Sequence, residues 1–130
     1  GERALLNFGH TLGHALEAAA GFGALAHGDA VAWGIRFALD LARERGWAAD
    51  LAPRLTALLD RLGVPPLPPL DGAAVLAALQ RDKKATEAGV RWVLPERLGQ
   101  GRWGIVLPPA GIAARLGPFL AAGAAPARGL

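Results

Sequence analysis

Apolar residues recur at helical spacing along most of this chain, and this pattern constrains the fold more than any other feature. The clearest stripe is formed by leucines three or four positions apart: Leu51, Leu55, Leu58, Leu59 and Leu62. Residues at such spacing share one face of a helix, which must be buried against another element. The pattern therefore predicts a mainly α fold. The expected helices cover residues 2–20, 29–45, 51–62, 71–81 and 109–121.

The segments between these stripes contain residues that end helices or form turns. Gly46 is expected to cap the second helix at its C-terminus, and Asp50 and Asp71 to cap the third and fourth helices at their N-termini. Alternating residues predict one small β-hairpin over about 90–107, with residues 95–101 as its connection. Residues 122–130 are expected to fray. The chain thus reads as a single helical domain, residues 1–130, with one hairpin.

Composition excludes several classes of protein. The 130 residues are 52% hydrophobic and 19% charged, which suits one ordinary globular domain and not a disordered segment. The chain has no cysteine, so any transition metal must be held by histidine and carboxylate groups. The net charge is +3, but the arginines are scattered and Lys83 and Lys84 are the only lysines. We therefore expect no nucleic-acid partner.

No apolar run reaches the roughly 18 residues that a membrane-spanning helix needs. The N-terminal segment also lacks the basic start and apolar stretch of a signal peptide. A cytoplasmic location without a membrane partner is the expectation. Because the chain has no methionine and opens inside a patterned segment, it looks like a piece of a longer polypeptide.

The three histidines of the chain all lie in its first 27 residues. His10 and His14 are four positions apart on one helical face, a spacing at which two imidazoles can bind one metal ion. His27 starts the next helix and would return beside the first helix if the two are antiparallel. Spacing favours His10 and His14 as the ligand pair, but leaves open which histidine binds metal and which transfers protons. The alternative is three ordinary histidines, which their clustering makes the weaker interpretation.

Further polar residues extend this candidate site, each with a simpler alternative. Arg3 and Asn7 continue the stripe and could contact an anion, or could be a solvated helix start. Lys83 and Lys84 could likewise hold an anion or form a solvated charge cluster. Glu17 could orient a histidine or simply be exposed.

Asp29 could also orient a histidine, or be a first-turn charge that favours the helix dipole. Gly9 and Gly13 interrupt the first predicted helix at a cost of about 1 kcal/mol each. That cost indicates a close approach by another backbone or by a ligand.

Three segments resemble those of one enzyme family, the 3-dehydroquinate synthases. Residues 3–15, RALLNFGHTLGHA, resemble the family's RxxLNFGHTxGHA segment. Residues 27–34, HGDAVAWG, resemble its HGExVAxG segment. Residues 82–95 resemble its segment that begins DKK, contains a glycine and ends VLP. The matches occur in the family's order and cover most of the chain.

The resemblance implies a two-domain enzyme whose active site lies between an N-terminal nucleotide-binding domain and a helical C-terminal domain. This chain would be the C-terminal one. The implied reaction converts 3-deoxy-arabino-heptulosonate 7-phosphate to 3-dehydroquinate and phosphate in the shikimate pathway, a lyase reaction of aromatic amino-acid biosynthesis. NAD would be used transiently and bound mainly by the N-terminal domain. Zinc, or cobalt, would hold the substrate hydroxyls. The expected partner is this sugar phosphate, and a homodimer of the full-length enzyme is left open.

Residue by residue, the resemblance implies roles that spacing alone does not give. His10 and His27 match the family's histidine metal ligands, and His14 matches the histidine near the phosphate that is thought to relay protons. The residues that match substrate-anion contacts are Arg3, Asn7 and one lysine of the pair, with Lys84 favoured over Lys83.

This chain departs from the family pattern in two ways. Asp29 stands where the family usually has glutamate, and the third metal ligand would be a glutamate before Gly1. We therefore expect this chain alone to bind zinc poorly and to lack synthase activity.

Three alternatives are weaker. The nearest is another sugar-phosphate cyclase, against which Asn7 and His14 favour the synthase. A metal-dependent alcohol or glycerol dehydrogenase would have no reason to keep the lysine pair. A non-enzymatic helical scaffold comes last.

Overall fold

The computed structural model describes residues 9–21, 23–81, 85–86, 89–97 and 100–124. These residues form five helices and a three-stranded antiparallel sheet, which confirms the mainly α fold. The elements in chain order are α2 (His10–Ala20), α3 (His27–Glu44), α4 (Leu51–Arg61), α5 (Gly72–Arg81), β1 (Ala85–Thr86), β2 (Gly89–Arg97), β3 (Gln100–Leu107) and α6 (Pro109–Gly123).

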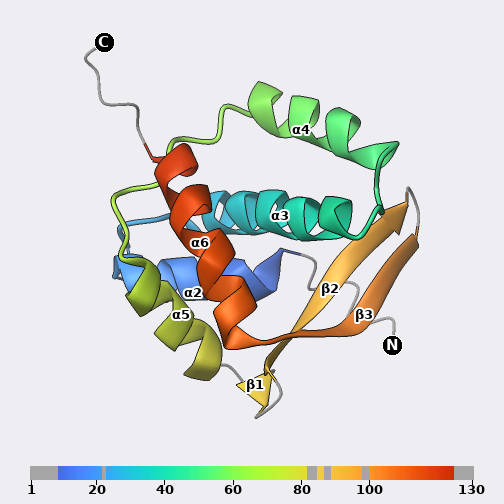
Figure 1. Cartoon of the computed structure of the whole chain (residues 1–130). Coiled ribbons are helices and arrows are strands. Elements are labelled where there is room, and N and C mark those ends of the chain that lie inside the picture. The colour runs from blue at the N-terminus through green and yellow to red at the C-terminus, as the bar shows by residue number, and fades with distance from the viewer. Residues whose placement is uncertain (1–8, 22, 82–84, 87–88, 98–99, 125–130) are drawn as a thin grey trace.

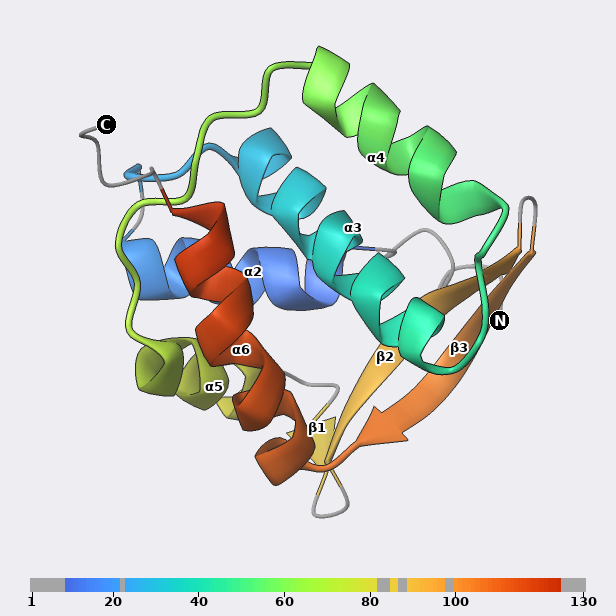
Figure 2. The ribbon, with the colours of Figure 1, turned by 45° about the horizontal axis from the view of Figure 1, so that its top comes forward.

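Helix α3 is the centre of the arrangement. It lies between α2 and α4, and α6 crosses it (Figure 1). Helix α5 packs against α2 and α6, while the hairpin of β2 and β3 packs against α3 at the end opposite its N-terminus (Figure 2). The core contains buried side chains from α2, α3, α5, β2 and α6. Phe37 of α3 lies in the middle of it, with ring centroids 5.4 Å from Trp92 and 5.0 Å from Phe119.

Glycines allow α2 and α3 to approach at backbone distance. A Cβ on Gly34 would lie 1.9 Å from the carbonyl oxygen of Gly9, and one on Gly13 would lie 3.2 Å from the carbonyl oxygen of Ala30. Real Cβ atoms essentially never lie as close as the first distance, and the second is tighter than most real Cβ contacts. The close backbone contact predicted from Gly9 and Gly13 is therefore confirmed, and it sets the distance between the two helices that carry the histidines.

The first predicted helix is wrong at Gly9. This residue has φ 86°, a left-handed conformation, and is the N-cap of α2, so the helix begins at His10 and cannot run through residue 9 in regular geometry. Residues 10–20 of that prediction are confirmed as α2, and residues 2–8 lie outside the described residues. Helix α3 begins at His27, two residues earlier than predicted, which places His27 in its first turn.

The capping predictions had mixed outcomes. Gly46 has φ 79°, and the backbone N–H groups of Gly46 and Trp47 donate to the carbonyls of Arg43 and Ala42, which is a Schellman cap as expected. The Asp71 carboxylate accepts from the N–H of Ala73 at 3.1 Å, which confirms the cap of α5. Asp50 was predicted wrongly: it has helical dihedral angles and makes no side-chain capping bond, so its oxygen cannot reach the first-turn donors.

The hairpin is confirmed over nearly the predicted range, but its two strands extend further toward its tip than predicted. Most of the predicted connection, residues 95–101, is strand, and β1 pairs with the start of β2 as a third strand. Pro95 lies opposite Gly101, between two irregularities of the ladder. β1 pairs only with Gly89 and Val90, so within the described residues the edge of β2 that faces β1 has no strand partner at Pro95. A proline, which lacks an N–H, is tolerated at such an unpaired edge.

No helix in the described part of the chain is both long and apolar enough to cross a membrane. The predicted frayed tail falls mostly on residues 125–130, outside the described residues. Within it, α6 continues to Gly123, and Ala124 bridges to Leu67.

Candidate metal centre

The three histidines come together where α2 meets the start of α3. The ring centroid of His10 lies 5.6 Å from that of His14 and 5.5 Å from that of His27, and His14 and His27 are 6.0 Å apart. His10 and His14 are one turn apart on α2, and His27 is brought to them from the first turn of α3. The predicted return of His27 beside the first helix is thus confirmed, and all three imidazoles border one small region.

Glu17 adds a carboxylate to this region. It follows His14 by one turn on α2, and its Oε2 lies 2.9 Å from Nδ1 of His27. The side chain of Glu17 is 19% exposed and that of His27 is 56% exposed. The interpretation of Glu17 as a residue that orients a histidine is therefore supported by a direct contact with His27.

Asp29, the other candidate for orienting a histidine, has no hydrogen bond or ion pair with any residue that the structure describes. It lies in the first turn of α3, where a negative charge favours the helix dipole. The structure thus favours the simpler alternative for Asp29.

Two ligand sets compete in this region. Ligand atoms of His14, Glu17 and His27 all lie within 4.8 Å of one another, as they would around one ion. His10 lies beside this set. Its ring centroid is slightly closer to that of His27 than the centroid of His14 is. His27 belongs to both ligand sets. His10 and His14 are the two candidates for the second histidine ligand.

The imidazole of His10 has an unusual property for a side chain in a folded protein. Its Nδ1 is buried and has no hydrogen-bond partner among the described residues. A buried polar atom in that state costs about 1–3 kcal/mol unless something satisfies it. Together with neutral imidazole donors and a nearby carboxylate, the ligand types that zinc accepts, this buried nitrogen fits a metal site.

Arg3, Asn7, Lys83 and Lys84 all lie outside the described residues. Their assignment to the substrate anions stays a prediction.

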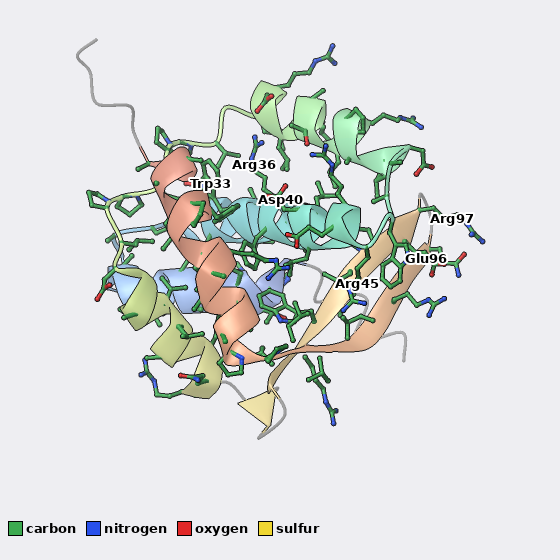
Figure 3. The ribbon with its side chains drawn as sticks, in the orientation of Figure 1. Trp33, Arg36, Asp40, Arg45, Glu96 and Arg97 are labelled. Carbon is green, nitrogen blue, oxygen red and sulfur yellow. The ribbon has the colours of Figure 1, made fainter. Side chains whose placement is uncertain are left out.

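Charged groups on the opposite side of α3 form a separate cluster. Arg36 and Asp40 point from α3 toward α4, and Arg36 donates to Asp60 of α4 at 2.7 Å (Figure 3). Glu44 of α3 pairs with Arg115 of α6, and the hydrogen bonds from this guanidinium lower the pKa of the Glu44 carboxyl. These ion pairs connect α4 and α6 to α3, and none of them involves a histidine.

Comparisons with known proteins point to one family. The family model described as "3-dehydroquinate synthase C-terminal" matches residues 1–85. The 3-dehydroquinate synthase of Geobacter metallireducens is 50% identical over 101 residues, which are 76% of this chain and 28% of that protein. The 3-dehydroquinate synthase of Methylococcus capsulatus is 46% identical over 103 residues, 77% of this chain and 29% of that protein.

One similar protein has a different name. The 2-epi-valiolone synthase of Actinosynnema mirum is 43% identical over 102 residues, 72% of this chain and 26% of that protein. In each of these three alignments the matched region is less than a third of the relative's length.

Proposed function

The chain belongs to the 3-dehydroquinate synthase C-terminal family, and from that premise we propose that it is the helical metal- and substrate-binding domain of a 3-dehydroquinate synthase. One observation carries the proposal. The family match over residues 1–85 includes His10, His14 and His27, and these three residues, 17 positions apart at the extremes, have ring centroids 5.5–6.0 Å apart in the fold.

The proposed reaction is that of the synthases among its relatives: 3-deoxy-arabino-heptulosonate 7-phosphate is converted to 3-dehydroquinate with loss of phosphate. The proposed resident ion is zinc, with cobalt as a substitute, and NAD is the proposed redox cofactor. When bound, the ion would polarise a substrate hydroxyl as a Lewis acid. The cytoplasm is the proposed compartment.

We assign the metal to His10 and His27, and proton transfer to His14. Three features support this division. The Nδ1 of His10 is buried and has no hydrogen-bond partner among the described residues, as expected of a metal ligand. His14 is exposed, so it can exchange protons with substrate or water. His27 is held by a carboxylate, as metal-binding histidines commonly are. Arg3, Asn7 and Lys84, with Lys83 as the alternative, are proposed to hold the substrate's anionic groups.

A second candidate function is 2-epi-valiolone synthase, which the Actinosynnema mirum relative favours. Its 43% identity is close to the 46% and 50% of the two synthases, so identity does not separate the two products. The product of the reaction separates them.

The test is a chimera in which residues 1–130 replace the matching C-terminal region of the Geobacter metallireducens synthase. Supplied with substrate, NAD and zinc, the chimera should release phosphate and form 3-dehydroquinate, identified by mass spectrometry. A chimera carrying His10→Ala is the matched negative control, and the unaltered Geobacter enzyme is the positive one. A folded, zinc-loaded chimera that makes no 3-dehydroquinate would contradict the proposal. Formation of 2-epi-valiolone from a heptulose 7-phosphate that has no carboxylate, offered in a parallel assay, would favour the second candidate.

A further inference from the structure

We propose that Glu17 is a positioning residue: its carboxylate holds His27 in the Nδ1–H tautomer and so leaves Nε2 free to bind the metal. This inference rests on the proposed function in one respect, namely that His27 binds a metal ion. The contact from which it starts, 2.9 Å between Nδ1 of His27 and Oε2 of Glu17, is independent of that function.

The chemistry of the two groups determines where the proton is. An ionised carboxylate can only accept a hydrogen bond. The nitrogen that faces it must therefore donate, which requires the proton of a neutral His27 to be on Nδ1. The other ring nitrogen then carries the lone pair, and a lone pair is what a metal ion requires of an imidazole. Contacts of this kind set both the tautomer and the basicity of histidine ligands.

Exposure explains why His27 needs such a partner. Its side chain is 56% exposed, so packing alone does not hold the ring in one orientation. The Glu17 side chain is only 19% exposed and is anchored on α2, one turn after His14. Within the part of the chain that the structure describes, His27 is the one hydrogen-bond partner of this carboxylate. The less mobile group therefore orients the more mobile one.

The helix pairing makes this contact possible. Glu17 and His27 come from different helices, and the glycine contact of Gly34 with Gly9 and of Gly13 with Ala30 sets the separation between those helices. The positions of the side chains also offer a second ligand set, in which Glu17 would bind the ion directly together with His14 and His27. The two arrangements predict different effects of replacing Glu17 by glutamine, because glutamine keeps an oxygen that accepts from Nδ1–H but is a poor substitute for a carboxylate ligand.

The experiment uses the 130-residue chain labelled with ¹⁵N-histidine, at a pH about 1.5 units above the ordinary histidine pKa of about 6.5. Two-bond ¹H–¹⁵N correlation spectra report the tautomer of each histidine, and a His27→Ala variant assigns the His27 signals. Without metal, wild-type His27 should be Nδ1–H. Glu17→Ala should shift it toward the Nε2–H form that free histidine prefers, and Glu17→Gln should keep Nδ1–H.

Zinc is then titrated into the same samples. Glu17→Ala should weaken the zinc-induced shifts of His27 by about 10- to 100-fold in concentration, the usual cost of losing such a partner, and Glu17→Gln by less. An Nε2–H tautomer in the wild type, or no tautomer change in Glu17→Ala, would overturn the proposal. So would an equal loss of zinc affinity in both variants, because Glu17 would then be a ligand. If the tautomers behave as expected but zinc in large excess over the chain still moves no histidine signal, the orienting contact stands and the proposed metal site fails.

Discussion

At the scale of single residues, Gly34 leaves the least room for a side chain among the glycines whose surroundings the structure describes. A Cβ at this position would lie 1.9 Å from the Gly9 carbonyl oxygen and 3.0 Å from the backbone nitrogen of Gly13. Both are backbone atoms and cannot rotate away, so Gly34→Ala must push α2 and α3 apart. We expect a loss of unfolding free energy at or above the usual overpacking cost of about 1–3 kcal/mol. Urea denaturation followed by circular dichroism measures this loss.

Gly28 provides the matched control on the same helix. No described residue lies within 4 Å of a Cβ built there, and its φ is not positive. Gly28→Ala should leave stability unchanged or raise it by up to about 1 kcal/mol, the helix-propensity gain of alanine. If Gly34→Ala unfolded at the same urea concentration as Gly28→Ala, the close backbone packing described above would be wrong.

The histidines differ in what their loss should do. Under the proposed assignment, His10→Ala and His27→Ala each remove a ligand and should weaken zinc binding to the chain by about 100-fold or more, since losing a mere orienting partner already costs about 10- to 100-fold. His14→Ala should change zinc affinity little. Isothermal titration with zinc, or the histidine NMR shifts, measures these differences.

If His14, Glu17 and His27 held the ion instead, the effects of His10→Ala and His14→Ala on zinc affinity would be reversed. There, His14→Ala would abolish binding and His10→Ala would not. That result would replace the assignment of His10 with one of His14. Equal zinc affinity in all three variants and the wild type would instead support a structural scaffold.

At the scale of helices and strands, an ion pair joins the C-terminal end of α3 to α6. Nε of Arg115 donates to both carboxylate oxygens of Glu44, at 2.7 and 2.8 Å, and NH1 donates to the Gly111 carbonyl. Hydrogen bonding to Arg115 lowers the pKa of the Glu44 carboxyl from its ordinary value of 4.5. A lowered folded-state pKa means that the pair stabilises the fold above about pH 4.5 and that this contribution is lost as pH falls through the lower, folded-state value.

Glu44→Gln should therefore lower the melting temperature at pH 7, and this difference should shrink as pH falls through the lowered folded-state pKa of Glu44. Because the two side chains are 46% and 40% exposed, the effect at pH 7 should stay under about 1 kcal/mol. Thermal unfolding across this pH range measures it. A double-mutant cycle with Arg115→Gln separates the pair from the bond to Gly111. A deficit that persists unchanged at acid pH would contradict the assigned cause.

The helices could largely be predicted from the sequence, but the start of the first one could not. Leucine spacing located α4 to within one residue, because periodicity reports the buried face directly. It could not reveal that Gly9 takes φ 86°, since a glycine in a helical pattern reads the same whether it is helical or left-handed. Pro95 was read as a turn residue for a similar reason: whether proline is tolerated in a strand depends on which neighbouring strand is present, and that is a tertiary fact.

At the scale of the whole molecule, the sequence could predict which histidines meet at the site, but not the distances between its side chains. Clustering of the histidines and helix pairing predicted that His10, His14 and His27 would meet, and they do. Sequence spacing could not find the contact between Glu17 and His27, because the two residues lie on different helices and their distance depends on how closely the helices pack. Predicting that distance requires knowing that three glycines remove the side chains between α2 and α3.

The isolated chain should fold, yet not catalyse the reaction. Its core joins α2, α3, α5, β2 and α6 around Phe37, so cooperative unfolding is expected. The proposed site, however, has two histidine ligands from this chain, and the resemblance implies a third ligand and an NAD-binding domain outside it. Two imidazoles alone leave zinc weakly held. With 3-deoxy-arabino-heptulosonate 7-phosphate, NAD and zinc, the 130-residue chain should therefore release no phosphate above the rate without protein, while the chimera with the Geobacter metallireducens synthase should. Full turnover by the isolated chain would show that the ligands and cofactor contacts needed for catalysis are all contained in residues 1–130.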